Sequence, residues 1–202
     1  MGHVQSHYQT LCCQVDAGAA AEALDRLFEE LFDLGVLEDR TTARSPDGQP
    51  GYPPGPHWEA AIVECDETFL ELEHNAVIGS ARRRVVDPGE FEFVALCPEC
   101  LEPRDFDSDW EASARSWLRG EGSAGLECPA CGHRTSVEDW AYDPPLGFAN
   151  LSVTFWNWPS INREFINRVQ RSVGTHLALI EGSGTTISNL VEAAEDDALT
   201  VP

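Results

Sequence analysis

The chain has 202 residues and a formal net charge of −22, because 35 acidic residues face only 13 basic ones. This length suits one domain with a small appendage and excludes a large multidomain assembly, while a 42% hydrophobic composition is enough for a folded core. Binding to nucleic acid or anionic lipid rests on cations that neutralise phosphates, so the charge argues against both kinds of partner.

The sequence has no run of 18 apolar residues, so we expect no membrane-spanning helix. Residues 1–15 lack the basic and apolar segments of a secretory signal, which predicts a cytoplasmic protein. All the basic residues are arginine, a composition typical of GC-rich bacterial genomes. In a reducing compartment, cysteines in closely spaced pairs indicate a metal site rather than disulfides.

The N-terminal part predicts a strand followed by an amphipathic helix. Polar and apolar residues alternate over His7–Val15, as in a half-buried strand. Apolar residues then recur at helical spacing over 18–34, with Asp16 as the expected N-cap and Gly35 as the stop. The outer face of this helix is acidic and carries Glu22, Asp25, Glu29, Glu30 and Asp33.

The middle of the chain predicts a loop and then a meander of strands. Prolines and glycines crowd residues 45–56 and deny that segment regular structure. Three strands are expected over Trp58–Glu64, Phe69–Ile78 and Phe91–Cys97, the last of which runs directly into a cysteine pair.

The C-terminal part repeats the order of strand and helix. Alternation over 151–155 predicts a strand, and a helix is expected from an N-cap at Ser160 to Gly174, followed by a strand over Thr175–Ile180. The order of elements predicts an α+β or α/β fold, with two amphipathic helices on one face of a mixed sheet in a split β-α-β arrangement. Residues 183–202 form an acidic tail.

The strongest motif is a pair of Cys-Pro-x-Cys segments, formed by Cys97, Cys100, Cys128 and Cys131. Two intervening residues let both thiolates of a segment reach one ion, and Gly132 suits the tight turn that follows the second segment. The two segments resemble the paired knuckles of zinc ribbons over about 35 residues of the chain. The resemblance implies a structural Zn²⁺ ion bound by four thiolates, a closed shell that leaves no position for a catalytic water.

The spacing between the two segments departs from the usual ribbon, because 27 residues (101–127) separate them where about 15 to 20 are typical. A short helix over Asp109–Arg119 is expected in this insertion. We therefore divide the chain into a body of residues 1–96 and 140–182, an inserted ribbon of 97–139 and the tail. A redox dithiol or an iron centre remains an alternative to zinc, and His133 an alternative ligand.

Other candidate features each have a structural alternative. The arginines of the run 82–84 and those at 163, 168 and 171 could grip an anionic ligand, but we expect them to pair with the many carboxylates. Trp156 and Trp158 are either exposed anchors for a partner or packing residues. Cys12 and Cys13 are adjacent on a strand and are expected to be buried thiols.

We expect a non-catalytic protein-interaction module, stabilised by the ribbon, whose acidic face and tryptophans bind a basic protein partner. More specifically, we expect an immunity or antitoxin-like inhibitor of a basic nuclease or toxin. The alternative from another class is a small-molecule enzyme with an Asp/Glu/Arg site in the cleft between sheet and ribbon. A transcription-associated ribbon fits the motif but conflicts with the charge.

Overall fold

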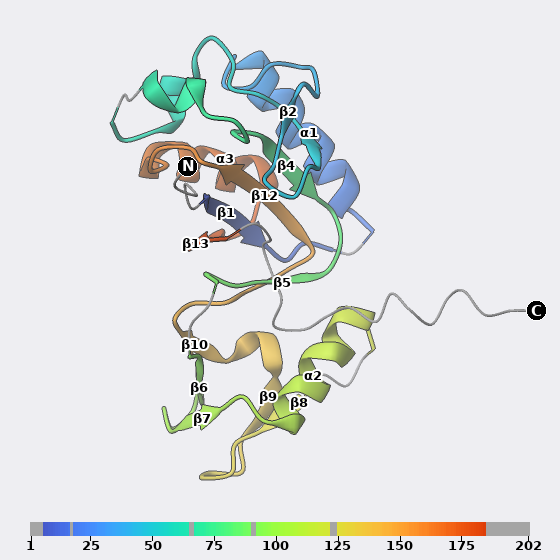
Figure 1. The fold of residues 1–202 in the computed structure, drawn as a ribbon. Coiled ribbons are helices and arrows are strands. Elements are labelled where there is room, and N and C mark those ends of the chain that lie inside the picture. Colours follow the sequence, from blue (N-terminus) through green and yellow to red (C-terminus); the bar gives the residue numbers. More distant parts are fainter. Residues whose placement is uncertain (1–5, 17, 65–66, 90–91, 122–124, 185–202) are drawn as a thin grey trace, which may run out of the picture.

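The computed structural model describes residues 6–16, 18–64, 67–89, 92–121 and 125–184, and shows an α+β protein (Figure 1). Almost all of the predicted acidic tail, as well as Cys65, lies outside these residues. Across the described ranges, no helix has the length and apolar character that crossing a membrane requires.

The main sheet has four strands in the order β13-β1-β12-β4, and every hydrogen-bonded neighbour in it is antiparallel. The prediction of a mixed sheet is therefore wrong for the main sheet, because no two of its hydrogen-bonded strands are parallel. Its strands are β1 (His7–Cys13), β4 (Val77–Ser80), β12 (Leu151–Trp156) and β13 (Ala178–Ser183).

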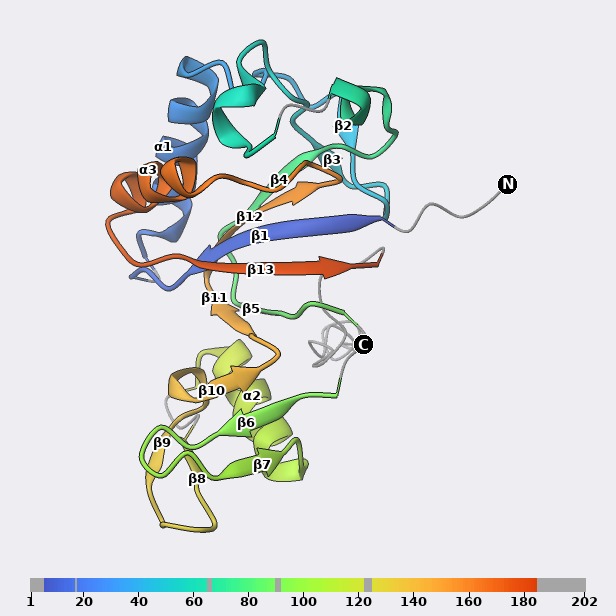
Figure 2. The ribbon, with the colours of Figure 1, turned by 90° about the vertical axis from the view of Figure 1, so that its left-hand side faces the viewer.

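Two helices lie on one face of this sheet (Figure 2). Helix α1 (Ala20–Asp33) joins β1 to β4, and β12 lies between those two strands. Helix α3 (Arg163–Val173) joins β12 to β13, and β1 lies between them. Each helix thus links two strands of the same direction across a third, which is the split β-α-β unit built twice, the topology called ferredoxin-like.

The helix ends differ in detail from the predicted ones. The predicted N-cap of α1, Asp16, is wrong, because Ala19 holds that position and no side chain caps the helix. Gly35 has the left-handed φ of 68° that ends a helix, as predicted. At α3, the side-chain oxygen of Asn162 accepts a hydrogen bond from the amide of Phe165 at 2.7 Å, so Asn162 rather than Ser160 is the N-cap.

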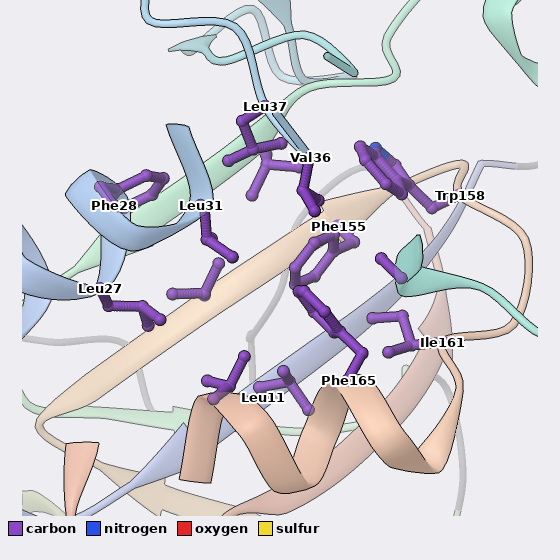
Figure 3. Close-up of a cluster of buried hydrophobic side chains, with 14 of the residues drawn as sticks. Leu11, Leu27, Phe28, Leu31, Val36, Leu37, Phe155, Trp158, Ile161 and Phe165 are labelled. Carbon is purple, nitrogen blue, oxygen red and sulfur yellow. The ribbon is translucent and has the colours of Figure 1, made fainter. Parts of the chain in front are cut away.

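A first hydrophobic core fills the space between the helices and the sheet (Figure 3). Leu27 and Leu31 of α1 and Phe165 of α3 point toward Phe155 of β12. The ring of Phe155 meets that of Phe165 edge-on at 6.0 Å and that of Trp158 at 5.3 Å. These buried side chains hold both helices on the sheet.

The segment between α1 and β4 does not form the strand predicted over Trp58–Glu64, and of the strand predicted over Phe69–Ile78 only the last two residues lie in a strand, β4. It contains the 3-10 helices η1 (Trp58–Ala61) and η2 (Glu67–Glu71), together with the two-residue strands β2 (Ala43–Arg44) and β3 (Pro50–Gly51). The aromatic residues that suggested strands instead pack into the first core, where the rings of Trp58 and Phe69 lie 4.8 Å apart.

Between β4 and β12 the chain leaves the sheet and builds a second lobe, drawn below the sheet in Figures 1 and 2. A β5–β11 pair leads into this lobe, which contains a three-stranded sheet in the order β10-β6-β7, the hairpin β8–β9, and one α-helix. Its elements are β5 (Arg84–Val86), β6 (Val94–Leu96), β7 (Pro103–Asp105), α2 (Ser108–Arg119), β8 (Gly125–Glu127), β9 (Arg134–Ser136), η3 (Val137–Asp139), β10 (Ala141–Asp143) and β11 (Gly147–Ala149).

The lobe has a hydrophobic core of its own, which includes Trp110, Trp117 and Trp140. The ring of Phe106 stacks on that of Trp110 at 3.9 Å. Helix α2 occupies the residues that lengthen the gap between the cysteine pairs, as predicted. The second core includes residues from 85 to 148 and is thus wider than the predicted insert of 97–139.

Two contacts tie the lobe to the main sheet. The guanidinium of Arg83 lies over the ring of Trp117 at 4.9 Å and donates to the carbonyl of Trp117 at 2.6 Å. On the sheet face away from the helices, Cys12 and Ile180 pack against Val86 of β5 and Ala149 of β11. The β5–β11 pair therefore covers part of that face.

Candidate metal centre

Two short turns, each following a strand of the lobe, position the four cysteines. Strand β6 runs into Cys97, and β8 runs into Cys128. In the first turn the amide of Leu101 donates to the carbonyl of Cys97 at 2.9 Å, and in the second the amide of Gly132 donates to the carbonyl of Cys128, also at 2.9 Å. The two knuckles thus have the same backbone design.

The sulfurs of the two knuckles converge on one point. All four lie within 4.8 Å of one another, with Cys97 and Cys131 at 3.8 Å and Cys100 and Cys128 at 3.7 Å. A Zn–S bond of about 2.3 Å in a regular tetrahedron places sulfurs about 3.8 Å apart, whereas a disulfide needs about 2.05 Å. The four side chains therefore fit one tetrahedral metal ion, and none of them is in a disulfide.

Backbone amides favour the thiolate form in the second knuckle. The pKa of Cys128 is lowered to about 7, chiefly by the backbone N–H of Cys131. Cys97 and Cys128 are buried, whereas Cys100 and Cys131 lie at the surface. His133 contributes its backbone, because its carbonyl accepts a hydrogen bond from the amide of Cys128 at 2.7 Å; the metal cluster found among the described residues contains only the four cysteines.

Cys12 and Cys13 are buried thiols, as predicted, and lie on opposite faces of the main sheet. Burial raises the pKa of Cys12 to about 12 and that of Cys13 to about 11. Thiols of this kind are poor nucleophiles at neutral pH because so little thiolate forms.

The prediction that Trp156 and Trp158 are exposed anchors is wrong, since their side chains are 1% and 0% exposed. The alternation of the strand ends at Asn157, whose left-handed φ of 58° reverses the direction of the chain. Trp158 consequently joins Phe155 in the first core, and its indole N–H donates to the carbonyl of Asn75 at 2.9 Å. Trp156 packs against Tyr8 on the other face of the sheet.

The predicted acidic face of α1 is largely exposed. Glu22, Asp25, Glu29 and Asp33 are at the surface, while Glu30 is half-buried. Glu22 pairs with Arg26 at 2.8 Å and Glu30 with Arg168 at 3.2 Å. Within the described part of the chain, the other three carboxylates form no ion pair.

A groove of about 460 Å³ runs beside α1, and no pattern in the sequence predicts it. Asp25 and Glu29 of α1 line this groove together with the rings of Phe28, Phe32 and Tyr52. The ring centroids of Phe28 and Phe32 each lie 4.9 Å from that of Tyr52. Tyr52 comes from the proline-rich segment, so its place beside the helix depends on the tertiary fold.

The expectation that carboxylates neutralise the arginine run is wrong for the residues the structure describes. Arg83 contacts Trp117, and neither Arg82 nor Arg84 forms an ion pair with any described residue. Of the three arginines of α3, only Arg168 has a carboxylate partner in the described ranges.

Comparisons with protein-family models, with curated proteins and with solved structures find no match to this chain.

Proposed function

We propose that the four cysteines bind a structural Zn²⁺ ion. The sulfur–sulfur distances of 3.7 and 3.8 Å, close to those of a ZnS₄ tetrahedron, carry this proposal. Four thiolates fill the coordination shell, so the ion holds the two knuckles together and leaves no position for a water nucleophile.

Metal analysis tests this assignment. The purified chain should contain one zinc per molecule, and Cys97→Ser should reduce the content to below about 0.2 because an open ligand position weakens a closed site. Cys13→Ala, which removes a thiol outside the site, should retain one zinc. An iron content equal to that expected for zinc would contradict the choice of metal, and full retention by Cys97→Ser would contradict the ligand set.

We further propose that the protein is a non-catalytic binding module for a basic protein partner. The groove beside α1 carries this proposal, because two carboxylates and three aromatic rings line one hollow. A cationic side chain there would contact ring faces and carboxylates at once. Asp25 and Glu29 have no competing ion pair among the described residues.

The charge of the whole chain supports the same class of partner. A net charge of −22 speeds the approach of a basic protein and repels acidic ones. An inhibitor of a basic nuclease or toxin, of the immunity or antitoxin kind, fits this description. The interface centres on the groove rather than on the tryptophans.

Copurification from the native host tests the groove. The wild-type chain at low salt should retain a basic protein, and binding should weaken as salt rises because exposed charges are screened. Asp25→Asn with Glu29→Gln should lose the partner. The control Asp105→Asn with Asp139→Asn removes the same charge from exposed residues of the lobe and should keep it. Equal recovery by both double variants, or no partner with the wild type, would contradict the proposal.

A further inference from the structure

A second hollow lies along β4, next to the groove beside α1. It has a volume of about 460 Å³ and shares Ile78 and Gly79 with that groove. Its other walls are polar and include Arg82, Arg84 and Trp156. A volume of this size is within the range of small-molecule sites, about 300–1,000 Å³.

The cationic wall of this hollow lacks a carboxylate partner in direct contact. The guanidinium of Arg84 forms neither a hydrogen bond nor an ion pair with any described residue, although the residue is half-buried. Burial lowers the pKa of Arg84, which means that the surroundings disfavour its charged form. A half-buried guanidinium without a protein acceptor is less well hydrated than one in bulk water, and a bound anion would offset that loss.

The one carboxylate at the rim is already engaged within its own turn. Asp47 acts on Arg84 through space and forms no ion pair with it. Its oxygens accept hydrogen bonds from the hydroxyl of Ser45 and from the side-chain amide of Gln49, the latter at 2.8 Å. Asp47 therefore leaves the donors of Arg84 free for a ligand.

A buried donor without an acceptor adds independent evidence. Trp156 lines the hollow with 1% of its surface exposed, and its indole N–H has no hydrogen-bond partner. The hydroxyl of Ser152 is also buried without a partner, and Ser152 is the register partner of Ser80, another wall residue. Native proteins leave few such groups unsatisfied, and an unoccupied ligand site is one cause of them.

We propose that this hollow binds a small organic anion whose phosphate or carboxylate groups accept hydrogen bonds from Arg84 and Arg82, with the buried indole of Trp156 as part of the wall. Guanidinium groups match both kinds of anion through paired hydrogen bonds. The volume exceeds the needs of a lone inorganic ion, and Ile78 offers an apolar contact for the organic part. The site is separate from the metal centre and does not depend on a protein partner.

Calorimetry on the zinc-loaded full chain tests the proposal with three probes: inorganic phosphate, AMP and citrate. AMP or citrate should bind with one-to-one stoichiometry and more tightly than inorganic phosphate; preference for AMP assigns phosphate esters and preference for citrate assigns polycarboxylates. Arg84→Gln should weaken binding at least tenfold, as expected for the loss of charge-assisted hydrogen bonds. Arg82→Gln changes an exposed position, so the loss of affinity in this second variant does not depend on the packing of β5.

The matched control is Arg163→Gln on α3, which removes one exposed positive charge far along the chain and should leave the affinity unchanged. In a nitrogen-edited NMR spectrum, the indole N–H signal of Trp156, assigned with Trp156→Phe, should shift when the anion binds. Failure of all three probes to bind, wild-type affinity in both Arg84→Gln and Arg82→Gln, or an equal loss in Arg163→Gln would overturn the proposal.

Discussion

Leu101 and Gly132 hold equivalent positions, directly after the second cysteine of each knuckle. Both have a left-handed backbone, with φ of 60° and 73° respectively. Glycine adopts this conformation freely, whereas a residue with a Cβ is strained in it by about 1–2 kcal/mol. Leu101 is also 68% exposed, so its side chain gains little from packing in return.

Leu101→Gly should therefore stabilise the zinc-loaded protein by about 0.5–1 kcal/mol, since relief of strain exceeds the added flexibility of the unfolded chain. Urea unfolding measures the change. Gly132→Leu is the reciprocal variant and should lower the free energy of unfolding by about 1–2 kcal/mol. A stability loss in Leu101→Gly would mean that the leucine makes a contribution that its exposure does not suggest.

Some single-residue features could be predicted from the sequence, and others could not. The spacing of the four cysteines identifies the cluster, because the geometry of two ligands separated by two residues is local and can be read from the sequence. The placement of Trp158 could not be read from alternation, because Asn157 adopts a positive φ and ends the period-2 pattern. The hollow at Arg84 was equally hidden, since the sequence alone does not show that the guanidinium of Arg84 lacks an ion pair with any described carboxylate.

At the scale of elements, one asparagine connects α3 to the segment before β4. Besides capping the helix, Asn162 donates from its side-chain amide to the carbonyls of Ala60 and Ile62, at 3.0 and 2.9 Å. Two of these three hydrogen bonds thus hold η1 against the start of α3, and the third caps the helix.

Asn162→Ala should lower the free energy of unfolding by about 2 kcal/mol, the sum of a lost cap and two lost hydrogen bonds of modest net value. Asn162→Ser keeps an acceptor for the cap and should lose less. Asn167→Ala, at an exposed position of the same helix, should change stability by less than about 0.5 kcal/mol. Thermal and urea unfolding of the three variants would test this, and equal losses at 162 and 167 would contradict it.

Elements with a long periodic pattern were predicted well, and short ones were not. The helices over 20–33 and 163–173 lie within the predicted segments because each has a continuous apolar stripe. Residues 58–61 and 67–71 instead form 3-10 helices, since their few apolar side chains enter the first core from a loop. Predicted strands of this length give too little periodicity to separate these alternatives.

At the scale of the whole molecule, two hydrophobic cores are joined through the β5–β11 pair. The first core lies between the helices and the main sheet, and the second surrounds the metal centre and α2. The split β-α-β arrangement could be predicted from the order of strand and helix at the two ends. The antiparallel pairing and the point of insertion depend on contacts between residues far apart in the sequence.

Removal of the metal should loosen one core and spare the other. In hydrogen exchange, a chelator should expose the amides of β6 and β8 by about a hundredfold or more, because binding energy of a structural zinc stabilises the strands it joins. The amides of β1 and β12 should stay protected. Restored zinc should reverse the change, and simultaneous loss of protection in both sheets would show that the molecule unfolds as a single unit.

The chain departs from β4 and returns at β12, and these strands are adjacent, with Ser80 opposite Ser152. A short turn could in principle close that hairpin, so the ferredoxin-like body has no topological need of the lobe. Yet β5 and β11, which begin and end the excursion, shield Cys12 and Ile180 on the underside of the sheet. Replacing the lobe by a short turn would expose this face of the sheet to solvent. The lobe is therefore an integral part of the body and cannot be removed without cost.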